Sequence, residues 1–243
     1  MHPQICKIGP FTVYSYGVML ILAFVAGTFL ARQQARKQNI NPELISNLTF
    51  IAFVAGIAGA RILYVLGNLP YYMSNPIEII MLQHGGLSWF GGLIAGSISA
   101  VIYIKKNKQS LYEILDLIVP FLALAHAIGR IGCLLNGCCY GKESAFGIYF
   151  KSLNAILIPT QLYSSLALIS IFIILRFLQD RPHWKGQVFY AYLLFYSLAR
   201  FCIEFFRADN PIIFLGLTVF QLFSIAAFVV GVSGLLITRK PRK

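Results

Sequence analysis

Long apolar segments recur along this sequence and constrain its fold more than any other feature. A helix of about 20 apolar residues crosses the ~30 Å hydrocarbon core of a bilayer. Segments close to that length lie at 14–31, 46–66, 85–104, 114–134, 160–178, 187–206 and 215–236. Only 12% of the residues are charged and 58% are hydrophobic, whereas soluble domains carry about 25% charged residues. The sequence therefore predicts an all-α, polytopic membrane protein with seven transmembrane helices, forming one integral-membrane domain over residues 1–243.

The basic residues predict how these helices are oriented. If the first segment runs from outside to inside, thirteen Lys and Arg residues fall in inner segments and four in outer segments. Inner loops of membrane proteins carry an excess of basic residues. We therefore expect the N-terminus outside and the C-terminus in the cytoplasm. The net charge of +12 then reflects topology, and nucleic acid is not expected as a partner.

Three further arginines, Arg61, Arg130 and Arg200, lie inside apolar segments. A charged side chain at membrane depth is costly, so it should face the protein interior and a partner. With the predicted orientation, each lies in the outer half of its helix. Guanidinium groups bind phosphate oxygens in a bidentate manner and stay protonated. We interpret the three arginines as part of a cavity for an anionic phospholipid headgroup, open to the outer leaflet.

The alternative is that these arginines pair with carboxylates or with carbonyls at helix ends. Glu204 is one helical turn after Arg200, and Asp116 is the one acidic residue within the fourth segment. Two carboxylates cannot neutralise three arginines together with Arg207. The count therefore favours a bound phosphate.

Glycines gather in and before the third apolar segment, where residues 84–96 read HGGLSWFGGLIAG, and the second segment contains GIAGA at 56–60. Small residues allow transmembrane helices to approach closely, which explains most of them. Irregular backbone at membrane depth is tolerated where it is buried or lines a polar cavity. The stretch from Gly85 to Gly92 is therefore also a candidate wall of the headgroup cavity.

Six motifs, in order along the chain, resemble those of the prolipoprotein diacylglyceryl transferase family: YSYG, GARILYVL, GGLSWFGGLIAG, GRIGCLLNGCCYG, PTQLY and RFCIEFFRADN. The resemblance covers nearly the whole chain. It implies a multi-pass enzyme of the bacterial inner membrane, with its active site toward the outer leaflet. Such an enzyme transfers diacylglycerol from phosphatidylglycerol to the lipobox cysteine thiol of a prolipoprotein signal peptide. The product is a thioether, glycerol phosphate is released, and no metal or soluble cofactor is implied.

The resemblance also implies site residues. Matching positions assign catalysis to Arg130, Arg200, Tyr16 and Glu204. They assign binding of phosphatidylglycerol to Arg61, Arg130, Asn136, Gly141, Tyr196, Arg200 and Arg207. In that role the arginines would hold the phosphate and stabilise the charge on the departing glycerol phosphate.

Several polar positions depart from the family pattern. Phe90 stands where the family has a histidine, Cys133 replaces an asparagine and Cys138 a glutamate, and Ile158 stands where a histidine is common. These departures indicate a divergent member. They leave open a relative that acts on another phospholipid or acceptor, and a non-catalytic lipid binder or transporter. A membrane thiol oxidoreductase using Cys133, Cys138 and Cys139 is a further alternative.

The loss of the family histidine raises the question of the general base. A thiol acceptor reacts as the thiolate, so its proton must be removed. His126 is one helical turn before Arg130 and is our assigned base; the alternative for it is a hydrogen-bonded core histidine. His84 stands before the glycine-rich segment and is a second candidate, unless it is an ordinary interfacial residue.

Cys133, Cys138 and Cys139 form a Cys-x4-Cys-Cys cluster on the predicted outer side. Its spacing lacks the paired cysteines typical of structural zinc sites, so no metal is predicted. We interpret the three as small packing residues in the turn after Arg130. A disulfide from Cys133 to Cys138 or Cys139, and a cysteine that carries the lipid covalently, stay open.

Overall fold

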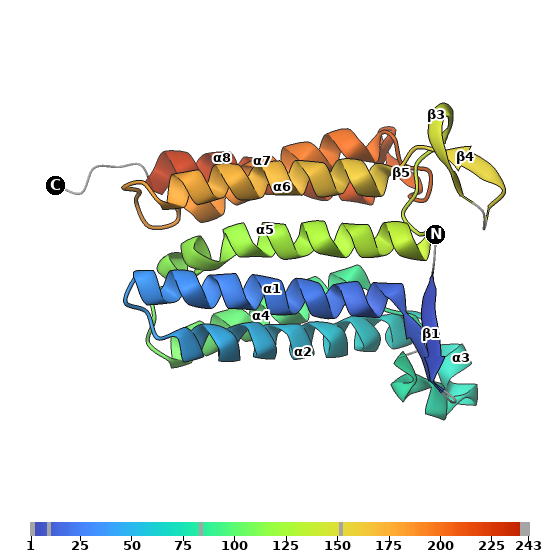
Figure 1. Ribbon diagram of the computed structural model, residues 1–243, viewed down its shortest axis with the longest axis horizontal. Coiled ribbons are helices and arrows are strands. Elements are labelled where there is room, and N and C mark those ends of the chain that lie inside the picture. The colour runs from blue at the N-terminus through green and yellow to red at the C-terminus, as the bar shows by residue number, and fades with distance from the viewer. Residues whose placement is uncertain (1–2, 9–10, 83–84, 151–152, 239–243) are drawn as a thin grey trace. The chain divides into compact units, whose positions relative to one another are not determined.

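The computed structural model describes residues 3–8, 11–82, 85–150 and 153–238. Each of the seven predicted apolar segments coincides with a long helix in it (Figure 1). The helices are α1 (Ser15–Lys37), α2 (Pro42–Gly67), α4 (Trp89–Lys106), α5 (Leu111–Asn136), α6 (Thr160–Gln179), α7 (Gln187–Glu204) and α8 (Val219–Thr238). Five of them, α1, α2, α5, α6 and α8, are long and apolar enough to cross a membrane. The prediction of a mostly helical membrane protein is confirmed.

The shorter elements lie between the long helices. A six-residue helix, α3 (Leu69–Ser74), is followed by the 3-10 helix η1 (Pro76–Ile80). Three antiparallel hairpins pair β1 (Gln4–Ile8) with β2 (Phe11–Tyr14), β3 (Glu143–Phe150) with β4 (Ala155–Leu157), and β5 (Ile212–Phe214) with β6 (Leu217–Thr218). The all-α prediction did not include these strands. Each is short and its pairing is local, so it leaves no apolar periodicity to detect.

The chain divides into two compact units. The first unit contains residues 1–31 and 115–243, and the second contains residues 32–114. In the first unit, α5, α6 and α7 enclose a buried apolar core formed by Val119, Ala123, Ala127, Leu168, Ile171, Leu175, Val188, Ala191 and Tyr192. This core fixes the faces that α5 and α7 turn toward each other.

Glycines allow the closest helix contacts in both units. In the first unit, a Cβ added to Gly234 of α8 would lie 2.2 Å from the ring of Tyr190 on α7. In the second unit, a Cβ added to Gly59 of α2 would lie 2.7 Å from the carbonyl oxygen of Gly91 on α4. Real side chains cannot occupy these positions without separating the helices, so the small-residue explanation holds for Gly59 and Gly91.

Asp116 and Pro120 connect α5 to its neighbours in the first unit. Pro120 lacks an N–H, so the carbonyl of Asp116, four residues earlier, loses its helical donor. Gln179 of α6 supplies one, with Nε2 donating to the Asp116 carbonyl at 2.8 Å. The Asp116 carboxylate accepts from the backbone N–H groups of Gly186 at 2.5 Å and Phe189 at 2.7 Å, and so caps the start of α7. Asp116 is therefore a helix cap, and its two carboxylate oxygens are occupied there rather than by an arginine.

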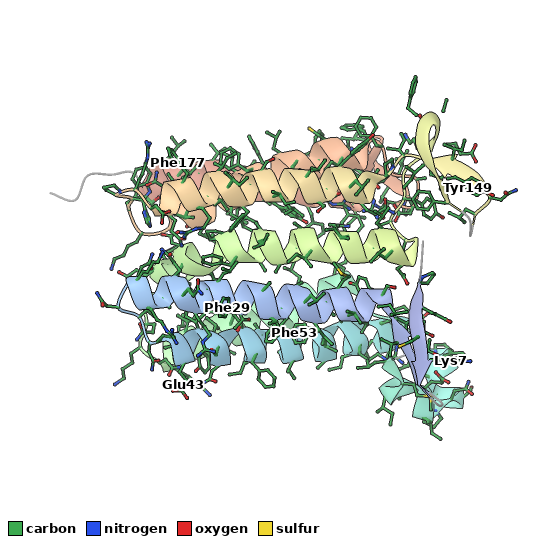
Figure 2. All side chains as sticks on the ribbon, viewed as in Figure 1. Lys7, Phe29, Glu43, Phe53, Tyr149 and Phe177 are labelled. Carbon is green, nitrogen blue, oxygen red and sulfur yellow. The ribbon has the colours of Figure 1, made fainter. Side chains whose placement is uncertain are left out.

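The outer faces of the helices carry large apolar side chains. Phe29 on α1 and Phe177 on α6, labelled in Figure 2, are 58% and 60% exposed. Apolar surface on this scale marks a surface that contacts other molecules, and membrane lipid is one of them. The exposed phenylalanines agree with the apolar spans found above.

Candidate functional site

A cavity of about 20 Å³ lies among α5, α6 and α7 in the first unit. His126 and Arg130 of α5 line it, together with Tyr196 and Arg200 of α7 and Ser164 of α6. The two residues from each of α5 and α7 are four positions apart, so they share one face of their helix. The predicted grouping of His126 and Arg130 is thus found in the structure. A cavity of this volume holds a single water molecule, so an anionic headgroup would enter only as the surrounding side chains move apart.

The cavity is electropositive. The Nε of Arg130 is buried and has no hydrogen-bond partner among the described residues. A buried donor without a partner costs about 1–3 kcal/mol, which an anion accepting from it would recover. Across the cavity, the ring of His126 on α5 contacts the ring of Tyr196 on α7, with centroids 5.5 Å apart. Tyr192 stacks on Tyr196 at 5.6 Å and so limits the movement of the Tyr196 ring.

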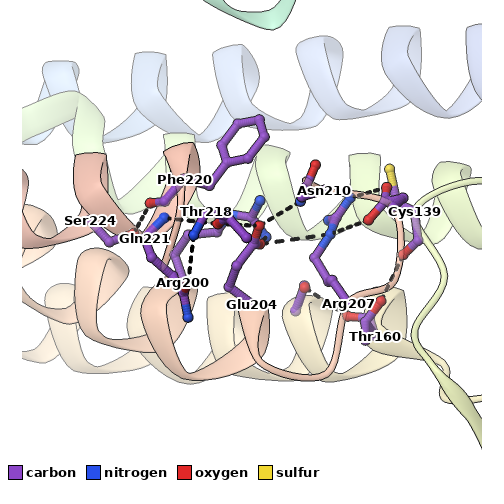
Figure 3. Close-up of polar contacts among 12 residues, drawn as sticks. Cys139, Thr160, Arg200, Glu204, Arg207, Asn210, Thr218, Phe220, Gln221 and Ser224 are labelled. Atoms are coloured by element: carbon purple, nitrogen blue, oxygen red, sulfur yellow. Dashed lines mark hydrogen bonds and ion pairs between the residues drawn. The ribbon is translucent and has the colours of Figure 1, made fainter. Parts of the chain in front are cut away.

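Arg200 is positioned by the buried carboxylate of Glu204 (Figure 3). Its Nη1 lies 2.8 Å from Glu204 Oε2, in an ion pair without hydrogen-bond alignment, and its guanidinium lies over the ring of Phe220. The other carboxylate oxygen of Glu204 accepts from Asn210 Nδ2 at 2.6 Å and from Thr218 Oγ1 at 2.9 Å. A buried carboxylate requires such partners, so Glu204 holds Arg200 in place at the edge of the cavity.

Arg207 lies on the other side of Glu204, with its Nε 3.8 Å from Glu204 Oε2. It donates from Nε to Asp209 Oδ1 at 2.9 Å and from Nη2 to Asp209 Oδ2 at 2.5 Å, a bidentate pair. Burial acts against the charged form, but the hydrogen bonds to Asp209 outweigh it, and the pKa of Arg207 is raised. Asp209 is the counter-charge that the sequence argument overlooked. Asp209 follows Arg207 by two residues in the sequence RADN, and this proximity is the sequence signal for the ion pair.

Gly141 brings the loop after α5 against Arg207. Its N–H donates to the Ile158 carbonyl at 2.9 Å, and it forms an isolated antiparallel bridge with Arg207. A Cβ added to Gly141 would lie 2.6 Å from the carbonyl oxygen of Phe206 and 2.8 Å from Ile158 Cβ. Only glycine permits this approach, which gives Gly141 a clear backbone role.

The sequence profile of the prolipoprotein diacylglyceryl transferase family matches residues 3–237 of this chain. The chain belongs to this family. The predicted membership is thereby confirmed, and the match extends over both units.

Individual relatives agree with the family match. A phosphatidylglycerol–prolipoprotein diacylglyceryl transferase of Clostridium tetani is 32% identical over 239 residues, which cover 96% of each chain. A protein of Clostridium perfringens with that name and the number 2 is 35% identical over 204 residues, covering 81% of this chain and 80% of its own. A protein of Staphylococcus carnosus with the same name is 32% identical over 252 aligned positions, covering 98% of this chain and 91% of its own.

Two further residues assigned from the family lie in the first unit, away from the lining of the cavity. Tyr16 is the second residue of α1 and is 38% exposed. Its ring lies against α5, because a Cβ added to Gly132 would be 3.4 Å from Tyr16 Cδ2. Asn136 is the last residue of α5 and is exposed. The structure therefore puts both at the end of α5 that follows Arg130.

Arg61, in the second unit, is buried among backbone carbonyls. Its guanidinium donates to five of them, those of Ile79, Gly85, Gly86, Glu78 and Met81. These bonds use all the N–H donors of the side chain. Arg61 thus holds the segment after α3 through backbone carbonyls, which is the alternative to phosphate binding considered for the three arginines. Gly85 and Gly86, which the sequence suggested as part of the cavity wall, are two of its acceptors. His84, the second candidate base, lies outside the described residues.

The positions that depart from the family pattern have distinct surroundings. Phe90, at the start of α4, makes an edge contact with Trp89 at 5.1 Å between ring centroids. Cys133, Cys138 and Cys139 are all free thiols, and their sulfur atoms lie within 4.8 Å of one another. Hydrogen bonds from the thiols of Cys133 and Cys138 lower the pKa of Cys139, and the nearby positive charges of Arg207 and Arg130 act in the same direction. The cluster is therefore more than three separate packing residues.

Proposed function

We propose that this chain transfers the diacylglyceryl group of phosphatidylglycerol to the lipobox cysteine thiol of a prolipoprotein, forming a thioether and releasing glycerol phosphate. The family and the names of its relatives support this activity. The observation that carries the proposal is the cavity in which Arg130 and Arg200 lie beside His126. Glu204 compensates the charge of Arg200, whereas the buried Nε of Arg130 has no partner among the described residues, and an arginine within an apolar helix requires one.

In the proposed reaction, Arg130 and Arg200 bind the phosphate of phosphatidylglycerol. The acceptor thiolate attacks the glyceryl carbon that carries the phosphate ester, so a carbon–sulfur bond forms and a carbon–oxygen bond breaks. Negative charge then grows on the departing glycerol phosphate, where preformed guanidinium groups stabilise it. The Nε of Arg130, which has no partner in the part of the chain that the structure describes, is available to donate to that oxygen.

His126 serves in this scheme as the base that takes the proton of the acceptor thiol. Its place in the cavity beside Arg130 supports the role. Glu204 acts through Arg200, while Tyr16, Tyr196 and Asn136 orient the donor and the leaving group. Arg207 and Gly141 support the binding site from the adjoining loop. A contact between Arg61 and the phosphate would require Arg61 to release some of its carbonyl partners, so we assign it a supporting role.

We further propose that α4 and α7 also cross the bilayer, which makes seven spans in one integral-membrane domain. Their lower mean hydropathy follows from charged residues, since α4 ends in Lys105 and Lys106 and α7 carries Arg200 and Glu204. The distribution of basic residues supports an outside N-terminus, a cytoplasmic C-terminus and an active site toward the outer leaflet. The bacterial family supports location in the plasma membrane.

The test is an assay of purified protein reconstituted in vesicles of phosphatidylglycerol with a lipobox peptide. Thioether product is expected with the cysteine peptide and not with a matched serine peptide. Arg130→Ala is expected to lower the rate by at least a hundredfold, because a lost transition-state donor costs about 2.7–4 kcal/mol. The control is Arg36→Ala, which removes an exposed arginine from the last turn of α1.

The same assay separates the alternatives. Product with another phospholipid but none with phosphatidylglycerol would indicate a relative with a different donor. Activity that is lost on reduction or in all three of Cys133→Ser, Cys138→Ser and Cys139→Ser would favour a thiol oxidoreductase. Absence of product with every peptide and donor would leave a lipid binder or transporter and would contradict the proposal.

A further inference from the structure

The three cysteines after Arg130 form a preorganised group of thiols. Cys133 lies in the last turn of α5, and the helix ends with both hydrogen bonds of a Schellman motif. The N–H of Cys138 donates to the Cys133 carbonyl at 3.1 Å, and that of Gly137, at φ 75°, donates to the Leu134 carbonyl at 3.1 Å. This turn folds Cys138 and Cys139 back over Cys133, which Cys-x4-Cys-Cys spacing alone does not reveal.

The first residues of α6 hold the turn in this shape. Thr160 Oγ1 donates to the Cys139 carbonyl at 2.7 Å, and Gln161 Nε2 donates to the Cys138 carbonyl at 2.6 Å. Thr160 and Gln161 are both almost completely buried. Cys139 itself has a φ of 62°, a conformation that costs a non-glycine residue about 1–2 kcal/mol. These contacts fix the backbone so that the three sulfur atoms converge.

We propose that Cys133, Cys138 and Cys139 form a binding site for a thiophilic metal ion such as Zn²⁺, with one coordination position left open. Zinc–sulfur bonds of about 2.3 Å place the sulfurs of a tetrahedral site about 3.8 Å apart. The sulfurs here lie within 4.8 Å of one another, so small side-chain rotations suffice. Thiolates select zinc and copper(I) over harder ions.

The surrounding charges suit the complex. Each thiol that binds the metal releases its proton to the solvent, and three thiolates with a divalent cation carry one net negative charge. The positive charges of Arg207 and Arg130 both act on Cys139, with Arg207 beside Cys139 in Figure 3 and Arg130 one turn before Cys133 on α5. These cations compensate the charge of the complex. Three protein ligands leave a fourth position for water or another ligand.

The metal site does not depend on the proposed transferase activity, so it is tested without substrate. Reduced protein, purified in detergent and stripped of metal, is titrated with Zn²⁺ against a chromophoric chelator and with Co²⁺ as a spectroscopic probe. We expect one ion per chain and a sulfur-to-cobalt charge-transfer band. Cys133→Ser, Cys138→Ser and Cys139→Ser should each weaken binding at least tenfold, whereas Cys202→Ser, at an exposed thiol of α7, should not.

A second measurement uses the unaltered chain and so does not depend on how the variants fold. Bound Zn²⁺ should protect Cys133, Cys138 and Cys139 from alkylation and leave Cys6 and Cys202 reactive. Equal alkylation of all five cysteines with and without Zn²⁺ would overturn the proposal. A disulfide within the cluster in protein isolated without reductant would overturn it as well.

Discussion

At the scale of single residues, Glu204 positions the arginines of the site. Its side chain is fully buried, and it lies between Arg200 and Arg207. Both of its oxygens have partners, one through charge and one through hydrogen bonds from Asn210 and Thr218. Removing one partner of a buried ion pair costs more than the pair contributes, because the remaining charge stays buried.

We therefore predict that Glu204→Gln destabilises the protein. The amide keeps an acceptor for Asn210 and Thr218 but leaves Arg200 without its counter-charge, whereas Arg207 keeps its pair with Asp209. The free energy of unfolding should fall by about 3–5 kcal/mol, measured as a lower thermal midpoint in detergent. Glu43→Gln, at an exposed position in the first turn of α2, should leave the midpoint nearly unchanged. Equal midpoints for the two variants would show that Glu204 contributes no such charge.

Arg61 allows a second residue-scale prediction that separates holding a loop from binding a phosphate. Lysine has fewer donors than arginine and a single charged atom, so Arg61→Lys leaves some of the five carbonyls unsatisfied. The thermal midpoint should fall by several degrees. A higher KM for phosphatidylglycerol with an unchanged midpoint would instead show direct contact with the phosphate.

At the scale of elements, the α5–α6 contact depends on a proline and a glutamine that are far apart in sequence. Pro120 leaves the Asp116 carbonyl without its helical donor, and Gln179 of α6 replaces it. Gln179 also donates to the Leu117 carbonyl at 3.1 Å. The Gln179 side chain thus donates to two carbonyls of α5, the helix on which Arg130 lines the cavity.

We predict that Gln179→Leu lowers the free energy of unfolding by about 1–3 kcal/mol, since it leaves the buried Asp116 carbonyl without a donor. Thermal denaturation in detergent measures the effect. Gln33→Leu, at an exposed position of α1, is the matched control and should have little effect. If the two variants behave alike, water or another donor satisfies the Asp116 carbonyl.

At the scale of the whole molecule, the orientation in the membrane can be tested by labelling. In a background in which all five native cysteines are replaced by serine, Ser144→Cys reports on the loop between α5 and α6, and Lys185→Cys on the loop between α6 and α7. A membrane-impermeant maleimide should label Ser144→Cys in intact cells, because the excess of basic residues places that loop outside. Lys185→Cys should be labelled only after permeabilisation. The reverse pattern would overturn the outside N-terminus.

The positions of the long helices followed from the sequence alone, because a span is recorded locally in the length of an apolar segment. The i,i+4 spacing likewise paired His126 with Arg130 and Arg200 with Glu204 in advance, since that spacing fixes a shared helix face. The short hairpins and the Asp209 pair were missed. The hairpins carry too little pattern, and Asp209 follows Arg207 by two residues, a spacing that helix periodicity does not pair.

Only the tertiary structure decided which donor meets which acceptor. Arg61 and Arg130 look alike in sequence, because both are arginines inside apolar segments. In the structure Arg61 donates to backbone carbonyls, whereas the buried Nε of Arg130 has no partner among the described residues. The sequence indicated that the three cysteines are separate packing residues. In the structure, the turn after α5 and its contacts with α6 place their sulfur atoms close together. Hydrogen bonds and ligand sets act over a few ångströms between segments distant in the chain, and folding alone sets those distances.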